Sequence, residues 1–138
     1  MAQAHAAKRG EASGLPTAEQ LATEVRVLSH VRERDPRDET NTVKMLEHFS
    51  FRSHLCIVFE LLSINLYEFI KNNCFMGVSL PLIRRFASQL LRALAYLATR
   101  QVVHCDVKPE NILLVAPGRS ALKLVDFGSA CFNAQPVY

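Results

Sequence analysis

The chain has 138 residues, a formal net charge of +3 and a pI of about 8.8, with 49% hydrophobic and 21% charged residues. This composition is typical of one globular domain with a modest core and excludes a disordered chain. Lysine and arginine are too dispersed to indicate a nucleic-acid surface, and no apolar run is long enough to span a bilayer, so we expect neither nucleic acid nor membrane as a partner.

The N-terminal part of the chain is expected to be a poorly ordered tail over residues 1–16, followed by a helix. The tail contains Ala, Gly and Ser and shows little apolar periodicity. Thr17 and Gln20 have the spacing of a capping box, which predicts a helix start. The helix is predicted over 17–34, and its apolar residues recur at helical spacing: Leu21, Val25, Leu28 and Val31.

The middle of the chain predicts a strand pair and then two helices. Residues 43–49 and 54–60 indicate antiparallel strands joined by a polar turn. A short helix is predicted over 66–71, and Ser79 is a plausible N-cap for a long helix with Pro81 in its first turn. The apolar stripe of this long helix is expected to face the core: Ile83, Phe86, Leu90, Leu94 and Leu97.

A hairpin is predicted over residues 112–125, near the C-terminal end of the chain. Residues 112–115 indicate a strand, 116–120 a Pro-Gly turn, and 122–125 a second strand whose alternation predicts one buried and one exposed face. The hairpin would bring Asn111 and Asp126, which flank it, to neighbouring points around one metal site.

The residues on either side of the hairpin are the candidates for catalysis and metal binding. The run from His104 to Asn111 has the spacing H-x-D-x-x-x-x-N, and Asp126 is followed by Phe-Gly. Asp106 would accept a proton from a substrate hydroxyl, Lys108 would face the transferred phosphate, and Asn111 and Asp126 would hold Mg²⁺ through oxygen ligands. The alternative is that these are solvated loop residues beside an ordinary turn. It is disfavoured because both motifs occur in the right order with a hairpin between them.

These motifs resemble a eukaryotic protein kinase, and the predicted element order is similar to the middle of a kinase domain. Cys105 stands where most kinases have Arg. Together with the Lys-Pro-Glu-Asn run and the segments 59–68 and 126–132, this cysteine makes the chain resemble the dual-specificity tyrosine-regulated kinase family. The resemblance implies an α+β, partial kinase-like fold over 17–138, from helix C to the start of the activation segment. Cysteine cannot make the bidentate contact by which that Arg usually pairs with a phosphorylated residue.

The resemblance implies ATP and Mg²⁺ as cofactors and assigns roles in nucleotide binding. Glu24 would form an ion pair with a strand lysine that contacts the phosphates of the nucleotide. The alternative is that Glu24 is a solvated helix carboxylate. Asp126 would bind the metal of the nucleotide. The adenine pocket would be formed by the side chain of Phe59, the backbone of Glu60 and Leu62, and the side chains of Leu113 and Val125. For Phe59, an ordinary core phenylalanine is an equally compatible alternative.

Other family features are not recognised in the sequence. No Gly-rich phosphate loop or convincing lysine strand precedes the first helix, and Lys8 is interpreted as a tail lysine. Tyr138 aligns with the first tyrosine of the family's Tyr-x-Tyr motif. We therefore expect the phosphate loop and the C-terminal half of the large lobe to be missing, and residues 55–59 to present an unpaired apolar edge.

The function implied is a protein kinase that transfers the γ-phosphate of ATP to Ser/Thr of protein substrates and to its own Tyr, with little activity from this chain alone. A non-catalytic interaction fragment or pseudokinase-like regulator is the alternative. A small-molecule phosphotransferase is disfavoured by Lys108-Pro109-Glu110 and the activation-loop-like end.

The cysteines argue against a zinc site, because they show no Cys-x-x-Cys spacing and no matching histidine cluster: Cys56, Cys74, Cys105 and Cys131. Cys56 is expected in the core. Since no signal peptide is recognised either, we expect a reducing intracellular compartment, cytoplasmic or nuclear.

Overall fold

The computed structural model describes residues 18–52 and 54–133. The predictions for Lys8, Thr17, Tyr138 and the 1–16 tail lie outside these residues. The elements are α1 (Ala18–Arg32), β1 (Met45–Phe51), β2 (His54–Phe59), α2 (Leu66–Asn72), α3 (Leu80–Thr99), β3 (Val102–Val103), the 3₁₀ turn η1 (Pro109–Asn111), β4 (Ile112–Leu114), β5 (Leu122–Leu124) and β6 (Cys131–Phe132).

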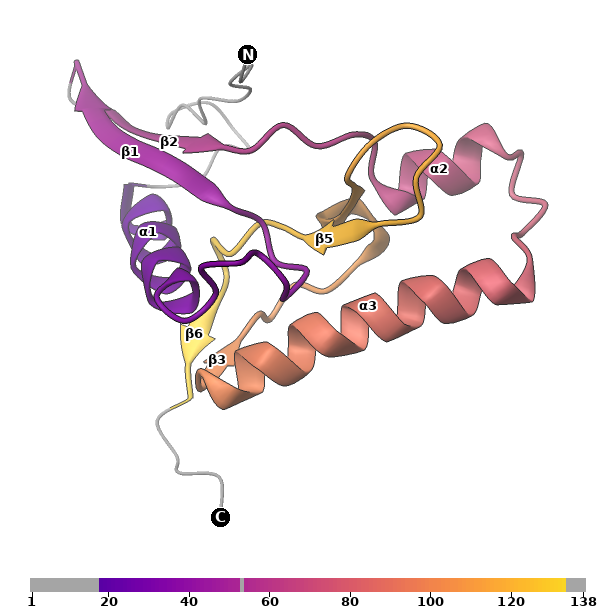
Figure 1. Cartoon of the computed structure of the whole chain (residues 1–138). Helices are drawn as coiled ribbons and strands as arrows, with labels where there is room; N and C mark the ends of the chain where they lie inside the picture. The colour runs from indigo at the N-terminus through magenta and orange to yellow at the C-terminus, as the bar shows by residue number, and fades with distance from the viewer. Residues whose placement is uncertain (1–17, 53, 134–138) are drawn as a thin grey trace.

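The short strands lie between two groups of larger elements. Figure 1 shows α1 with the β1–β2 ribbon on one side of the molecule and α2 and α3 on the other. The strands pair antiparallel as β1–β2, β3–β6 and β4–β5. The predicted order of helices, strand pair and hairpin is therefore confirmed. β6 was not predicted, because a two-residue strand gives no periodic signal.

The core joins α1 to α3 through the β4–β5 hairpin. The buried face of α1 differs from the predicted stripe, because Val27 is buried whereas Val25 is only half-buried. Leu97 of α3 is buried, and Phe127 fills the space between the helices with no exposed surface. A single hydrophobic cluster thus supports the segments on both sides of the hairpin.

The prediction that Ile83 belongs to the core is wrong. Its side chain is 47% exposed, whereas Phe86, Leu90 and Leu94 pack partly buried against the core. The first turns of α3 extend beyond the hairpin that covers the middle of the helix (Figure 1). Ile83 instead borders an apolar cavity of about 420 Å³ between α2 and α3. Cys56, expected in the core, is also only half-buried.

The predicted exposed face of β5 is also absent. All three residues of β5 are buried, including Lys123, whose charge is compensated by Asp38 and Glu60. On the other side of the molecule, β2 pairs with β1 alone among residues 18–52 and 54–133. Its second edge carries no strand in this part of the chain. None of the described helices combines the length and apolarity that crossing a bilayer requires.

Candidate active site

The segment between β3 and η1 folds around the buried imidazole of His104. Its Nδ1 accepts a hydrogen bond from the Asp106 amide at 3.2 Å, so Nε2 carries the proton and donates to the Val125 carbonyl at 2.9 Å. The ring also packs edge-to-face on Phe127, with centroids 4.9 Å apart. His104 therefore connects the 104–111 motif, to which it belongs, with the segment that contains Asp126 and Phe127.

The Asp106 carboxylate receives two hydrogen bonds through Oδ2. Lys108 Nζ lies 2.8 Å away and Asn111 Nδ2 2.9 Å away. The hydrogen bond and charge of Lys108 outweigh desolvation and lower the pKa of Asp106 below its ordinary value. The same contact raises the pKa of Lys108. Asp106 is thus held ionised, in the state that can accept a proton.

Asn111 ends η1 and is buried. Its Nδ2 also donates to the Asp106 carbonyl at 2.9 Å, and its own carbonyl accepts from the Val125 amide at 2.9 Å. Because both side-chain bonds use the amide nitrogen, Oδ1 remains available as a metal ligand. The amide contacts fix Asn111 between the loop and the strand that leads to Asp126.

Two residues of the site adopt left-handed backbone conformations. Asp126 has φ +64° and Cys105 has φ +66°. Aspartate tolerates this region better than most residues, whereas cysteine does not. Such conformations cost about 1–3 kcal/mol each and are concentrated at functional sites. The strain at Cys105 indicates that the contacts around this loop hold its conformation.

Cys105 also contacts Cys131 of β6, with the two Sγ atoms 3.7 Å apart. The hydrogen bond with Cys131 raises the pKa of the Cys105 thiol. Most kinases have a cationic Arg at this position. In this chain the position therefore carries a neutral thiol.

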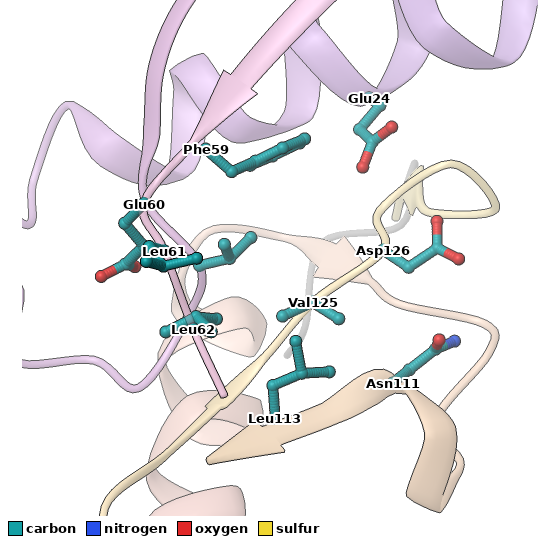
Figure 2. A pocket seen from close by; sticks show the side chains of 10 residues that line it. Glu24, Phe59, Glu60, Leu61, Leu62, Asn111, Leu113, Val125 and Asp126 are labelled. Carbon is teal, nitrogen blue, oxygen red and sulfur yellow. The ribbon is translucent and has the colours of Figure 1, made fainter. Parts of the chain in front are cut away.

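A cavity of about 310 Å³ opens beside these motifs, within the size range of small-molecule sites. Figure 2 shows Glu24, Asp126 and Asn111 on one side of it, with Phe59, Leu62, Leu113 and Val125 toward the other. The cavity therefore has one polar end and one apolar end, as a ligand with an apolar ring and a charged tail would require.

The structure brings all the predicted nucleotide-binding residues to this cavity: Glu24, Phe59, Glu60, Leu62, Leu113, Val125 and Asp126. Asp106 and Lys108 do not line it and adjoin it through Asn111. Val43 and Leu61 also line the cavity, and neither was predicted. Both lie in apolar stretches of the sequence, where the local pattern does not distinguish a cavity-lining residue from one that only packs against its neighbours.

Glu24 is a buried carboxylate on the inner face of α1, 1% exposed. Its Oε1 accepts a hydrogen bond from the Phe127 amide at 3.3 Å. The alternative of a solvated helix carboxylate is therefore wrong, because α1 turns this side chain toward the cavity. Helix α1 is in this way joined to the segment that follows Asp126.

The wall opposite the acidic groups includes residues 60–62, the first part of the segment 60–65, which we call the hinge. The Glu60 amide donates to the Lys44 carbonyl at 3.0 Å, and the Ser63 amide donates to the Leu114 carbonyl at 2.7 Å. Between these anchors, the Glu60 carbonyl and the Leu62 amide bond to no other described residue. Backbone groups need partners when they are covered, so this acceptor and donor are available to a ligand.

The residues at the polar end fit a hard divalent cation. Asp126 offers a carboxylate and Asn111 an amide oxygen on the same cavity wall. Within residues 18–52 and 54–133, no cluster of three or more His, Cys, Asp or Glu side chains could hold a metal. Mg²⁺ commonly takes one or two protein ligands and completes its shell with water and phosphate oxygens, so this pair suits it.

Comparisons with known proteins identify relatives. The protein kinase domain family model matches residues 2–137. Dual specificity tyrosine-phosphorylation-regulated kinase 3 is 51% identical in Rattus norvegicus and 50% identical in Homo sapiens, over 119 residues that cover 86% of this chain and 20% of each relative. The kinase mbk-2 of Caenorhabditis elegans is 51% identical over 119 residues, 15% of its length. The chain thus spans about a fifth or less of these relatives.

Proposed function

The chain belongs to the protein kinase domain family, and from that premise we propose that it transfers the γ-phosphate of ATP to Ser and Thr of protein substrates and to its own Tyr. The observation that carries this proposal is the convergence of three groups. Asn111 hydrogen-bonds the Asp106 carboxylate at 2.9 Å and shares one cavity wall with Asp126. In the proposed site, the proton acceptor and the two metal ligands would therefore lie side by side.

Each of these residues has a chemical role in the proposed reaction. The substrate hydroxyl oxygen bonds to the γ-phosphorus, the bond to the β–γ bridging oxygen breaks, and the hydroxyl proton passes to the Asp106 carboxylate. Lys108 Nζ, 2.8 Å from that carboxylate, would face the transferred phosphate. Asn111 and Asp126 would hold Mg²⁺, which supplies charge neutralisation for the phosphates.

The other end of the cavity suits adenine. The Glu60 carbonyl and the Leu62 amide offer an acceptor and a donor, which complement the amino group and the ring nitrogen on one edge of adenine. Guanine has the opposite pattern on that edge, so ATP is the favoured nucleotide. The side chains of Phe59, Leu113 and Val125 supply apolar surface for the ring.

A phosphotransfer assay tests the proposal. The purified protein is incubated with Mg²⁺, labelled ATP and a generic substrate such as casein, and incorporation of label is measured with and without a chelator. We expect metal-dependent phosphorylation of Ser and Thr at a low level, because little activity is expected from this chain alone. Nucleotide binding without any transfer would contradict the enzymatic proposal and favour the alternative of a non-catalytic regulator.

The lowered pKa of Asp106 gives a pH-dependent prediction. Asp106 accepts a proton only when ionised, so activity is expected to persist as the pH falls and to be lost as it passes through the lowered pKa. Lys108→Met removes the main cause of the shift, which returns the pKa toward its ordinary value. The acid limb of kcat/KM should therefore move to higher pH in this variant, in addition to any overall loss of rate.

The matched control is Lys71→Met, which removes the same charge from the exposed surface of α2, where Lys71 pairs with Glu68. Its acid limb should coincide with that of the unmodified protein. An acid limb that stays in place in Lys108→Met would show that Asp106 is not the group whose ionisation limits the reaction.

The state of the cysteines supports the proposed compartment. All four are unpaired thiols, with Cys56 half-buried and the others exposed. Thiols persist in this state where the surroundings are reducing. We therefore place the protein inside the cell, in the cytoplasm or the nucleus.

A further inference from the structure

Lys123 is a buried cation in the middle of β5, 6% exposed, between Leu122 and Leu124. Its Nζ lies 2.7 and 2.6 Å from the two carboxylate oxygens of Asp38 and 2.6 Å from Oε1 of Glu60. Burying such a group is costly, and an apolar residue in its place often gives equal or greater stability. This arrangement therefore calls for an explanation other than stability.

Glu60 connects this ion cluster to the hinge. Its Oε1 accepts hydrogen bonds from Lys123 Nζ and, at 2.7 Å, from the Lys44 amide. Its own amide donates to the Lys44 carbonyl at 3.0 Å. Figure 2 shows the Glu60 carboxylate directed away from Asn111 and Asp126, while the residue itself borders the cavity. The side chain thus acts as an anchor for the backbone that faces the ligand.

The same hairpin holds the other end of the hinge. The Ser63 amide donates to the Leu114 carbonyl at 2.7 Å, and the Leu114 amide donates to the Ile64 carbonyl at 2.9 Å. In the hairpin, Lys123 is paired with Leu113, which lines the cavity. One rigid pair of strands therefore fixes both ends of the hinge and supplies a wall of the cavity between them.

We propose that Lys123, supported by Asp38, is a positioning residue for nucleotide recognition, because its hold on the Glu60 carboxylate sets the position of the hinge backbone that reads adenine. This inference rests on the proposed function and assigns Lys123 no contact with ATP. Hydrogen bonds weaken steeply when distance or angle departs from the optimum, so a small shift of the hinge would weaken both contacts to adenine. The phosphate end of the cavity would be unaffected.

Calorimetric titration of Lys123→Met with ATP, adenosine and Mg²⁺-tripolyphosphate separates the two ends of the site. We expect the Kd of adenosine and of ATP to rise about tenfold, the size of one lost hydrogen-bond contribution, with that of tripolyphosphate unchanged. Lys44→Met is the matched control. It removes a lysine side chain from the other residue that contacts Glu60 but keeps the backbone amide that makes the contact, so all three affinities should stay the same.

Glu60→Ala provides a second variant that leaves Lys123 paired with Asp38 and so orphans no buried cation. It should weaken adenosine binding to a similar extent even if Lys123→Met does not fold. The double variant should bind adenosine no more weakly than Glu60→Ala alone, because the contact of Glu60 that Lys123→Met removes is already absent in that variant.

The inference is overturned if Glu60→Ala binds adenosine as the unmodified protein does, or if adenosine and tripolyphosphate affinities fall together. Failure of the unmodified protein to bind ATP would overturn the proposed function and this inference with it. Normal ATP binding with unaffected variants would overturn the role of Lys123 alone.

Discussion

Replacement of Asp106 by asparagine is expected to lower turnover about 10²–10⁴-fold, the range for loss of a general base. Asparagine keeps the size of the side chain and an oxygen that can accept from Asn111 Nδ2, but it cannot take up the hydroxyl proton. The affinity for Mg²⁺-ATP should change little, because Asp106 does not line the cavity. Single-turnover phosphotransfer combined with an ATP titration measures the two quantities separately.

Glu47→Gln is the control for this experiment, because it removes a carboxylate charge from an exposed position of β1. It should leave turnover unchanged. If Asp106→Asn retained the turnover of the unmodified protein, Asp106 would not be the proton acceptor, and the roles assigned to its neighbours in the loop would lose their support.

The largest effect on stability is expected for Phe127→Ala, which should lower the free energy of unfolding by about 3–5 kcal/mol. Phe127 has no exposed surface and packs on the His104 ring, and its amide donates to Glu24. Removing the ring leaves a cavity where α1, the hairpin and the loop meet. Since small domains are stable by only about 5–15 kcal/mol, this loss is a large share of the total.

Phe51→Ala offers the matched comparison, because it removes the same atoms from a side chain that is 56% exposed at the end of β1. The loss there should stay near the cation–π contribution of Arg52, about 0.5–1 kcal/mol. Urea unfolding of both variants measures the difference. Equal losses at the two positions would mean that Phe127 does not occupy the core.

The site could largely be located from sequence because its parts lie in short, nearly contiguous segments. Asp106 and Asn111 lie in the same short run of residues, 104–111. The hairpin that returns the chain from Asn111 to Asp126 has a clear Pro-Gly turn. Local spacing therefore determines most of the geometry. The position of Glu24 came from the resemblance alone, because a buried carboxylate on a helix has the same local pattern as a solvated one.

Features that depend on distant partners could not be predicted. The alternation of 122–125 predicts an exposed face that would include Lys123, yet its partners Asp38 and Glu60 lie 85 and 63 residues away in the sequence. β6 is defined only by its pairing with β3. The exposure of Ile83 depends on how far the hairpin extends along α3. In each case tertiary contacts override the local pattern.

The central claim is that Asn111 and Asp126 bind the metal of a nucleotide seated in one cavity, and paramagnetic broadening tests it most directly. Mn²⁺ replaces Mg²⁺, and NMR spectra of the labelled protein are recorded with and without ATP. We expect ATP-dependent broadening that is strongest at the Asn111 side-chain amide and the Asp126 backbone amide and decays toward the first turn of α3. Broadening centred outside the cavity, or independent of ATP, would contradict the claim.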